Sequence, residues 1–184
     1  MATIDQMQLE TDRLILRQWH DDDREPFAQV NADPLVMEHF PSSLSRADSD
    51  AFVDRIEAGF DINGFGLFAV EVVDVHRFIG FVGLARPSFE AHFTPAVEIG
   101  WRMSSTHWGL GYATEAAKAC VEFAFTDIGL DELVSFTVPQ NTASRLVMER
   151  IGMTHDPSDD FNHPRFPNDQ RMERHVLYRL TRTP

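Results

Sequence analysis

Apolar residues alternate with polar ones along some segments of the chain and recur with a helical period along others. The alternating or continuous apolar runs predict strands at 13–19, 65–73, 77–85, 96–102, 133–138 and 171–180. The helical pattern predicts helices at 21–31, 45–60, 113–126 and 143–150. Hairpin-like strands come first, and helices and strands alternate after them. This order predicts an α/β fold with a mixed sheet, mostly antiparallel N-terminal strands and helices on both faces.

Local signals place several of the element ends. Asp74-Val75-His76 joins two apolar runs and indicates a hairpin. Ser45 or Asp48 is expected to cap the second helix. The acidic run Asp21–Asp23 is interpreted as a solvated helix start, because acids there suit the helix dipole. A functional acidic triplet is the alternative.

The size and composition of the chain predict a single domain over residues 1–184. A chain of 184 residues that is 43% hydrophobic can bury one good core. The acids Asp5, Glu10 and Asp12 and the lack of an early apolar segment argue against a signal peptide, and no apolar run is long enough for a membrane span. A lone Cys120 permits no intrachain disulfide and suits a reducing cytoplasm. The sequence leaves a monomer and a homodimer equally open.

The formal net charge of −13 argues against nucleic acid or an anionic membrane as a partner. It favours a cationic substrate such as an amine, although solubility alone also explains it. His155, His163 and His175 lack the spacing of metal ligands, so no metal site is predicted.

The most informative segment is 107–117, which reads His-Trp-Gly-Leu-Gly-Tyr-Ala-Thr-Glu-Ala-Ala and follows the apolar run 97–101. A strand, a glycine turn and a helix in this order aim free N–H groups and a helix dipole at one point, which predicts a phosphate site. No Gly-Lys-Ser/Thr follows, and the third glycine of a dinucleotide fingerprint is missing. A plain helix-entry turn therefore stays open as the alternative. The turn residues expected to contact phosphate are Trp108, Gly109, Leu110, Gly111, Tyr112, Ala113 and Thr114.

A second segment, 139–153, contains Asn141-x-x-Ser144, a short helical pattern and Gly152-Met153. Together with the glycine turn and the opening 9–17 (Leu-Glu-Thr-Asp-Arg-Leu-Ile-Leu-Arg), it resembles the GNAT N-acetyltransferases, most closely the RimJ/RimL type that acetylates ribosomal-protein N-termini. The resemblance covers roughly 9–180. It implies the GNAT fold, acetyl-CoA as cosubstrate and an amine acceptor, either a protein N-terminus or a small amine.

The resemblance also implies roles for single residues. The turn 108–114 would bind the pyrophosphate of acetyl-CoA, with Trp108 where the family usually has Gln or Arg. The backbone of Trp101, Arg102 and Met103 would pair with the pantetheine arm, which Asn141 would also contact. Asn141 is in addition a good helix cap.

Glu98 lies on the strand that leads into the turn, ten residues before Trp108, and its position resembles that of the catalytic glutamate in several family members. The resemblance therefore implies that Glu98 is the candidate base. At pH 7 about 0.04% of a lysine amine is neutral, against about 14% of an α-amine, so an N-terminal amine needs only a weak base. The alternative is a carboxylate paired with an arginine.

Ser144 stands where the RimJ/RimL type has a serine, and the resemblance implies that it is the acid for the departing thiolate. Backbone bonding in the first helical turn is its alternative role. Many family members have a tyrosine seven residues after the asparagine, where this chain has Met148. That absence leaves open a non-catalytic acyl-CoA-binding module, and the glycine turn alone leaves open a nucleotide-binding protein. The Pro- and Asp-rich loop 161–167 either shapes a substrate mouth or is a surface connection.

Overall fold

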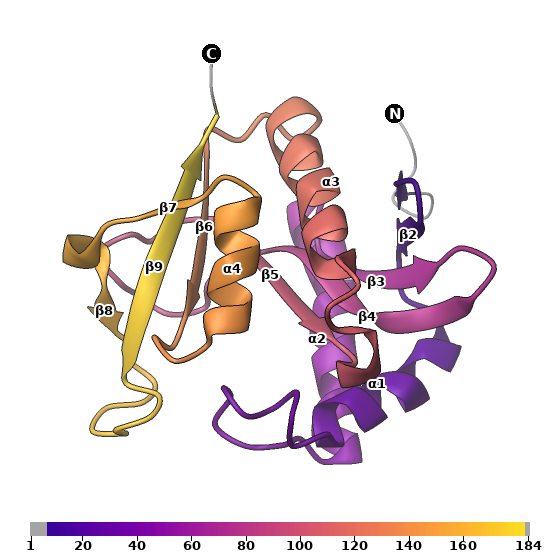
Figure 1. Ribbon diagram of the computed structural model, residues 1–184, viewed down its shortest axis with the longest axis horizontal. Helices are drawn as coiled ribbons and strands as arrows, with labels where there is room; N and C mark the ends of the chain where they lie inside the picture. The colour runs from indigo at the N-terminus through magenta and orange to yellow at the C-terminus, as the bar shows by residue number, and fades with distance from the viewer. Residues whose placement is uncertain (1–6, 183–184) are drawn as a thin grey trace.

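The protein is seen here as a computed structural model that describes residues 7–182 (Figure 1). Its centre is a mixed sheet with the strand order β1-β2-β3-β4-β5-β6-β9-β7, and β8 pairs with β9. Within the described range every neighbouring pair is antiparallel except β5 and β6. The strands are Leu9–Glu10 (β1), Leu14–Arg17 (β2), Leu67–Val72 (β3), His76–Ala85 (β4), Glu98–Met103 (β5), Glu132–Thr137 (β6), Thr154–His155 (β7), Phe161–Asn162 (β8) and Arg174–Thr181 (β9).

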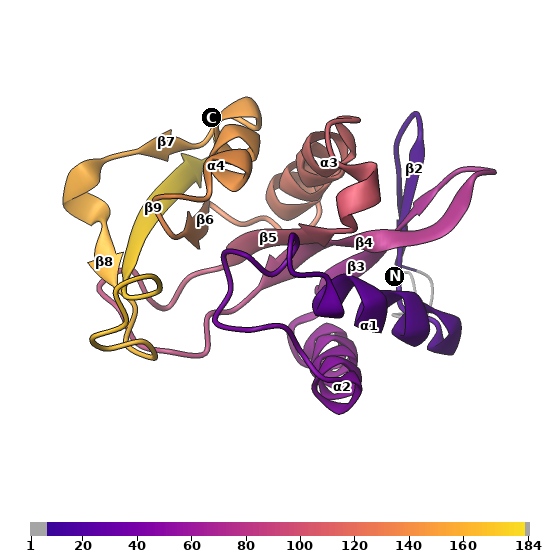
Figure 2. The same ribbon diagram turned by 60° about the horizontal axis from the view of Figure 1, so that its bottom comes forward.

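Four α-helices among the described residues cover the sheet on both faces, as Figure 2 shows. They are Arg24–Ala32 (α1), Arg46–Asn63 (α2), Tyr112–Thr126 (α3) and Thr142–Arg150 (α4). In Figure 2, α1 and α2 lie below the sheet, and α3 and α4 lie above it. The predicted mixed sheet with helices on both faces is therefore confirmed. No helix in the described range has the length and apolar character needed to cross a bilayer.

Local side-chain chemistry fixes the ends of two helices. Ser45 accepts a hydrogen bond from the backbone N–H of Asp48 (3.1 Å) and so caps α2. Asn141 accepts one from the N–H of Ser144 (3.2 Å) and caps α4. Helix α2 ends at Gly64, whose φ of +72° suits the left-handed C-terminal turn.

The structure corrects the interpretation of Asp21–Asp23. These residues form a 3-10 turn, and α1 begins only at Arg24. Asp23 is 3% exposed, and its two carboxylate oxygens accept hydrogen bonds from Arg17 at 2.7 and 2.9 Å. The solvated interpretation is wrong for Asp23, because the buried guanidinium of Arg17 on β2 requires a counter-charge.

The other differences from the predicted elements lie at short or irregular segments. Strands β1, β7 and β8 have two residues each, which is too short to produce an alternating pattern. The last strand starts at Arg174 and not at Arg171, because Asp169 accepts hydrogen bonds from the N–H groups of Arg171 and Met172 (2.9 and 3.1 Å) and holds a turn there. The signal-peptide expectation rests in part on residues 1–6, which lie outside the described range.

The sheet splits between β5 and β6. Their only registered pair in the described structure is Glu98 with Val134, next to a hydrogen bond from the Val134 N–H to the Val97 carbonyl (2.9 Å). Each strand is paired along its whole length on its other side, β5 with β4 and β6 with β9. The two strands therefore diverge beyond Glu98, as Figure 1 shows. This split leaves the facing backbone edges of β5 and β6 open to a ligand.

Candidate active site

The glycine turn presents a row of unsatisfied N–H groups. Gly109 and Gly111 have φ of +76° and +84°, which glycine adopts without the steric cost other residues meet. The first hydrogen bond of α3 runs from the Glu115 N–H to the Gly111 carbonyl (3.0 Å). Within residues 7–182, no protein atom accepts a hydrogen bond from the N–H groups of 109–114. Successive free donors at a helix N-terminus are the arrangement typical of anion-binding sites.

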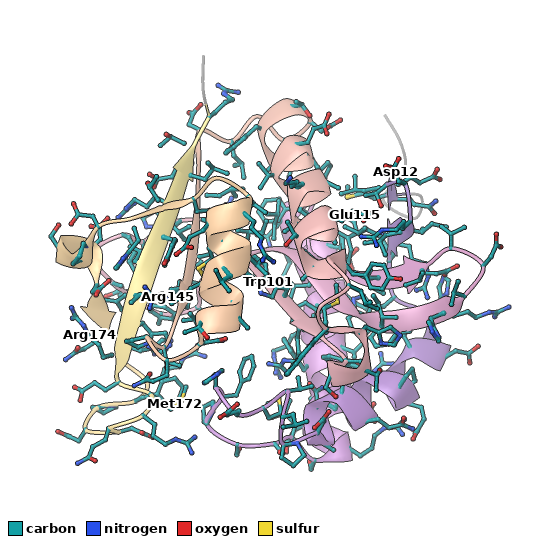
Figure 3. The ribbon with its side chains drawn as sticks, in the orientation of Figure 1. Asp12, Trp101, Glu115, Arg145, Met172 and Arg174 are labelled. Atoms are coloured by element: carbon teal, nitrogen blue, oxygen red, sulfur yellow. The ribbon has the colours of Figure 1, made fainter. Side chains whose placement is uncertain are left out.

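The opening segment of the chain braces this turn. Glu115, in the first turn of α3, accepts hydrogen bonds from the Thr11 hydroxyl (2.6 Å) and from Nε of Arg13 (2.7 Å). Arg13 also donates to the Leu110 carbonyl (3.1 Å), and its guanidinium lies 4.7 Å from the ring centre of Tyr112. In Figure 3, Glu115 faces the segment that carries Asp12. Partial burial alone would raise the pKa of Glu115, but the hydrogen bonds from Thr11 and Arg13 outweigh burial and lower it.

Replacing Glu115 with glutamine tests whether this brace supports phosphate binding. Loss of a negative charge near an anion would by itself tighten acetyl-CoA binding, whereas loss of the brace weakens it. We expect the Kd for acetyl-CoA to rise by roughly 3–10-fold, because a charge-assisted contact is worth about 1 kcal/mol. Glu122→Gln is the control, since it removes an exposed carboxylate from the same helix. Calorimetry that gave unchanged or tighter binding for Glu115→Gln would contradict the brace.

A second feature is a cavity of about 680 Å³ that crosses the sheet at the split. Its wall below the sheet comes from α2, the end of β4 and the loop that carries Phe40. Its wall above the sheet includes Asn141 and Ser144 at the start of α4. Its outer side is closed by the loop after β8, where Arg171 donates to the Phe40 carbonyl (3.2 Å). Figure 3 shows Met172, which also lines the cavity, on this loop.

Glu98 lies in this cavity at the point where β5 and β6 separate. No arginine pairs with it in the described structure, so the alternative role as an ion-pair partner is not observed. Part of the residue opens to the cavity, but protein atoms surround the carboxyl group and burial raises its pKa to about 8. A carboxyl group with this pKa changes its protonation state close to neutral pH, as a general base must.

Ser144 faces Glu98's strand from across the split. Its hydroxyl oxygen accepts a hydrogen bond from Nε1 of Trp101 (3.0 Å), and within residues 7–182 the hydroxyl makes no hydrogen bond to the backbone of its helix, the role considered as the alternative. Figure 3 shows Trp101 between α4 and the strands. Because the oxygen accepts from the indole, the Ser144 proton is left to donate to another group. Asn141 donates to the Thr137 hydroxyl (3.0 Å), which fixes its side chain at the cavity wall.

The remaining predicted residues lie near these features but not all in one place. Met103 is buried, and its carbonyl accepts from Nε1 of Trp108 (3.0 Å), so the half-exposed Trp108 is anchored to β5. The backbone of Trp101, Arg102 and Met103 pairs with β4 and leaves its other edge facing the split. Met148, at the position where many family members have a tyrosine, lines the cavity. No cluster of His, Cys, Asp or Glu in the described range has the arrangement of a metal site.

One group of site residues was not singled out from the sequence. Thr11 and Arg13 belong to the opening motif, but their contact with Glu115 spans about a hundred positions and left no local signal. The loop 161–167 supplies cavity residues, which favours its interpretation as part of a substrate mouth over that of a mere surface connection. Its Phe161 packs with Phe89, Phe93 and Phe136 into a second aromatic core beside the cavity.

Comparison with known proteins gives consistent matches. The sequence model for the acetyltransferase (GNAT) domain matches residues 13–154. The chain is similar to FsC-acetyl coenzyme A-N(2)-transacetylase of Aspergillus fumigatus, with 32% identity over 181 residues covering 95% of this chain and 76% of that protein. It is similar to the acetyltransferase from Agrobacterium tumefaciens str. C58, with 29% identity, a TM-score of 0.79 and coverage of 96% and 95%. The ribosomal L7/L12 alpha-N-protein acetyltransferase RimL in complex with coenzyme A shares the fold, with 14% identity, a TM-score of 0.74 and coverage of 95% and 98%.

Proposed function

We propose that this chain, which belongs to the GNAT acetyltransferase family and is an N-acetyltransferase, moves the acetyl group of acetyl-CoA to a primary amine by direct attack on the thioester. One observation carries the proposal: a single cavity crosses the sheet at the β5–β6 split and holds Glu98 and Ser144 on its walls. An acceptor entering from the α2 side and a thioester arm from the α4 side would meet there. The membership of an acetyltransferase family favours an enzyme over a non-catalytic binding module.

The residues present suit acetyl-CoA as the cosubstrate, which supplies an activated acetyl group. The six free N–H groups of 109–114 would hold its pyrophosphate. The free edge of β5 at Trp101–Met103 and the side chain of Asn141 would hold the pantetheine arm. The overall charge of −13 repels an anionic ligand, so these local donors must supply the affinity.

We assign the proton transfers to Glu98 and Ser144. With a pKa of about 8, Glu98 is a base strong enough to take the proton of an amine, directly or through a water. Ser144 donates the proton that the departing thiolate needs, and the indole of Trp101 sets the direction of its hydroxyl. Met148 leaves no tyrosine to perform this second transfer.

The Ser144→Ala variant should lower kcat by roughly 10–100-fold. The expected loss is at or below the small end of the usual effect of general acid catalysis, because water can partly replace Ser144 as the proton donor. Steady-state kinetics by thiol release would measure the loss, and calorimetry would show an acetyl-CoA Kd within about threefold of wild type. Ser135→Ala is the control, because Ser135 also lines the cavity but lies on β6. Equal kcat values for both variants would remove Ser144 from the proposed chemistry.

The proposed function is tested by incubating the protein with acetyl-CoA and a panel of primary amines, with thiol release and product mass as readouts. The panel contains peptides with free N-termini, a lysine-side-chain amine and small amines, because the RimJ/RimL resemblance leaves the acceptor open. Acetylation of at least one primary amine, dependent on Glu98, is expected. Acetyl-CoA binding without transfer to any of these amines would contradict the proposal.

A further inference from the structure

The charge of the cavity is opposite to that of the whole chain. The chain carries a net charge of −13, yet the side chains that line the cavity include four arginines and one carboxylate. The carboxylate is Glu98, and burial favours its neutral form. The arginines are Arg55, Arg86, Arg102 and Arg165. None of the four forms an ion pair with a carboxylate in residues 7–182.

Arg102 is the most unusual of these arginines, because it is buried without a counter-charge. It is 9% exposed, and its guanidinium donates to Oδ1 of Asn31 (2.5 Å), a neutral acceptor. Its Nε is buried and has no hydrogen-bond partner. Aromatic rings surround the guanidinium, with centres 4.2 Å (Phe40), 5.3 Å (Phe52) and 5.7 Å (Phe81) away. Burial lowers the pKa of Arg102 to about 10, so the group still carries its charge at neutral pH.

Another buried arginine of the protein, Arg17, has the carboxylate partners that Arg102 lacks. Arg17 is also 9% exposed, but it pairs with Asp23 at 2.7 Å and with Glu71 at 3.1 Å. A buried charge without a counter-charge is strongly destabilising, and cation–π contacts offset only part of that cost. Arg102 therefore lacks the anion that Arg17 has, and the cavity is the space from which an anion would reach it.

The register of β5 relates Arg102 to the proposed base. Residues at alternate positions of a strand share a face, so Glu98, Gly100 and Arg102 lie in one row along the cavity. The Cα atoms at the two ends of such a row are about 13 Å apart. Gly100, between them, leaves space in the cavity next to the strand. A Cβ added there would have only a Glu98 oxygen (3.7 Å) within 4 Å.

We propose that the acceptor is a primary amine that also bears a carboxylate, with the amine at Glu98 and the carboxylate paired with Arg102. This inference rests on the proposed function and names its substrate class. Two of the other arginines are held in place at the cavity: Arg165 donates to the carbonyl and hydroxyl of Ser88 (3.0 and 2.6 Å), and Arg86 donates to Oδ1 of Asn63 (3.2 Å). A carboxylated small molecule and a peptide with an acidic residue near its N-terminus offer the same chemistry.

The test compares matched acceptors that do or do not carry the anion, with kcat/KM expressed per neutral amine because a nearby carboxylate also raises the amine pKa. One arm uses unbranched amino acids from glycine to 6-aminohexanoate, each beside its primary carboxamide. The other uses the C-terminally amidated peptides Ser-Asp-Ala and Ser-Asn-Ala. We expect kcat/KM to be roughly 10–100-fold higher for the carboxylate of the preferred pair, because a hydrogen-bonded charge is worth 1.5–3 kcal/mol. A preference in the amino-acid series would identify a small molecule as the source of the carboxylate, and a preference in the peptide pair would identify a peptide. The best chain length in the amino-acid series gives the spacing between amine and carboxylate.

The Arg102→Met variant should bring this carboxylate-to-amide ratio close to one, mainly through KM for the carboxylate, and Arg102→Lys should keep part of it. A ratio is insensitive to the fraction of protein that folds. If Arg102→Met cannot be purified, two measurements still test the inference. They are the carboxylate-to-amide ratio of the wild type and that of Arg165→Gln, which should be lower. Equal kcat/KM within every wild-type pair, or an unchanged ratio in Arg102→Met, would overturn the inference. Transfer to the amides would show that acetyltransfer itself survives, and transfer to no amine at all would overturn the proposed function instead.

Discussion

Replacing Glu98 with glutamine should lower kcat/KM for acetyl transfer by roughly 10²–10⁴-fold, the usual contribution of a general base. Glutamine keeps the shape of the side chain but cannot accept the amine proton. The acetyl-CoA Kd should stay within about threefold of wild type, because Glu98 lies on the cavity wall and not in the glycine turn. Glu90→Gln is the matched control, since Glu90 is an exposed carboxylate on the loop beside the cavity. A Glu98→Gln enzyme with more than a third of wild-type kcat/KM would exclude the base assignment.

The pH dependence of kcat/KM provides an independent test of Glu98 as the base. Only the deprotonated carboxylate is a base, so wild-type kcat/KM should rise as pH increases through about 8, and Glu98→Gln should lose this step. An acceptor that is already neutral at pH 6, such as a hydrazide, keeps the amine's own titration out of the profile. Burial lowers the pKa of His163, and it lowers the pKa of His175 to about 4, which keeps His175 neutral across the measured range. The other ionisable side chains that line the cavity are His39, Arg55, Arg86, Arg102 and Arg165.

As pH rises towards 8, the free energy of unfolding should fall while activity increases. The folded-state pKa of about 8 lies above the ordinary value of 4.5, so the folded protein holds the proton after the unfolded chain has lost it. The contribution of Glu98 to the free energy of unfolding is then present in full below pH 4.5 and is lost as pH rises towards 8. Glu98→Gln should consequently melt at or above the wild-type Tm at pH 7.5. A lower Tm for the variant would point to a structural role for the carboxylate.

The sequence predicted those parts of the site that depend on neighbouring residues. The free N–H groups at 109–114 follow from two glycines before a helix, and the Asn141 cap follows from its position before α4. Both are local consequences of backbone chemistry. The resemblance placed Glu98 and Ser144 in one mechanism, and the structure places both on the same cavity. Their roles remain predictions that kinetics must test.

The charge of the cavity could not be predicted in the same way. Four arginines from α2, the end of β4, β5 and the loop after β8 meet only after the sheet has formed. The net charge even points the other way, because most of the acids lie on the surface and outside the cavity. Arg102 looks like any alternating residue of a strand, and only its burial beside Asn31 without a carboxylate marks it. The partner contacts of Arg13 and Arg17 were hidden for the same reason.

Replacing Gly111 with aspartate should weaken acetyl-CoA binding by at least about 100-fold. Like charges in a binding site cost several kcal/mol, and 2.7 kcal/mol already corresponds to 100-fold in Kd. The φ of +84° adds strain to any residue with a Cβ, and that Cβ would lie 3.4 Å from the Arg13 guanidinium. Gly111→Ala carries the strain without the charge, so its loss of affinity should be intermediate. Calorimetric titration with acetyl-CoA measures all three proteins.

Gly129 offers a matched control beyond the opposite end of the same helix. Its φ is +77° and an added Cβ would meet nothing within 4 Å, so Gly129→Asp introduces similar backbone strain and the same charge away from the turn. Both aspartate variants should lose about 1 kcal/mol of stability, or roughly 2–4 °C in Tm, but only Gly111→Asp should lose acetyl-CoA binding. Equal affinities in the two variants would mean that the phosphate does not lie at the turn. That result would also remove the source of affinity proposed here for an anionic cosubstrate in so acidic a chain, the free N–H groups at the start of α3.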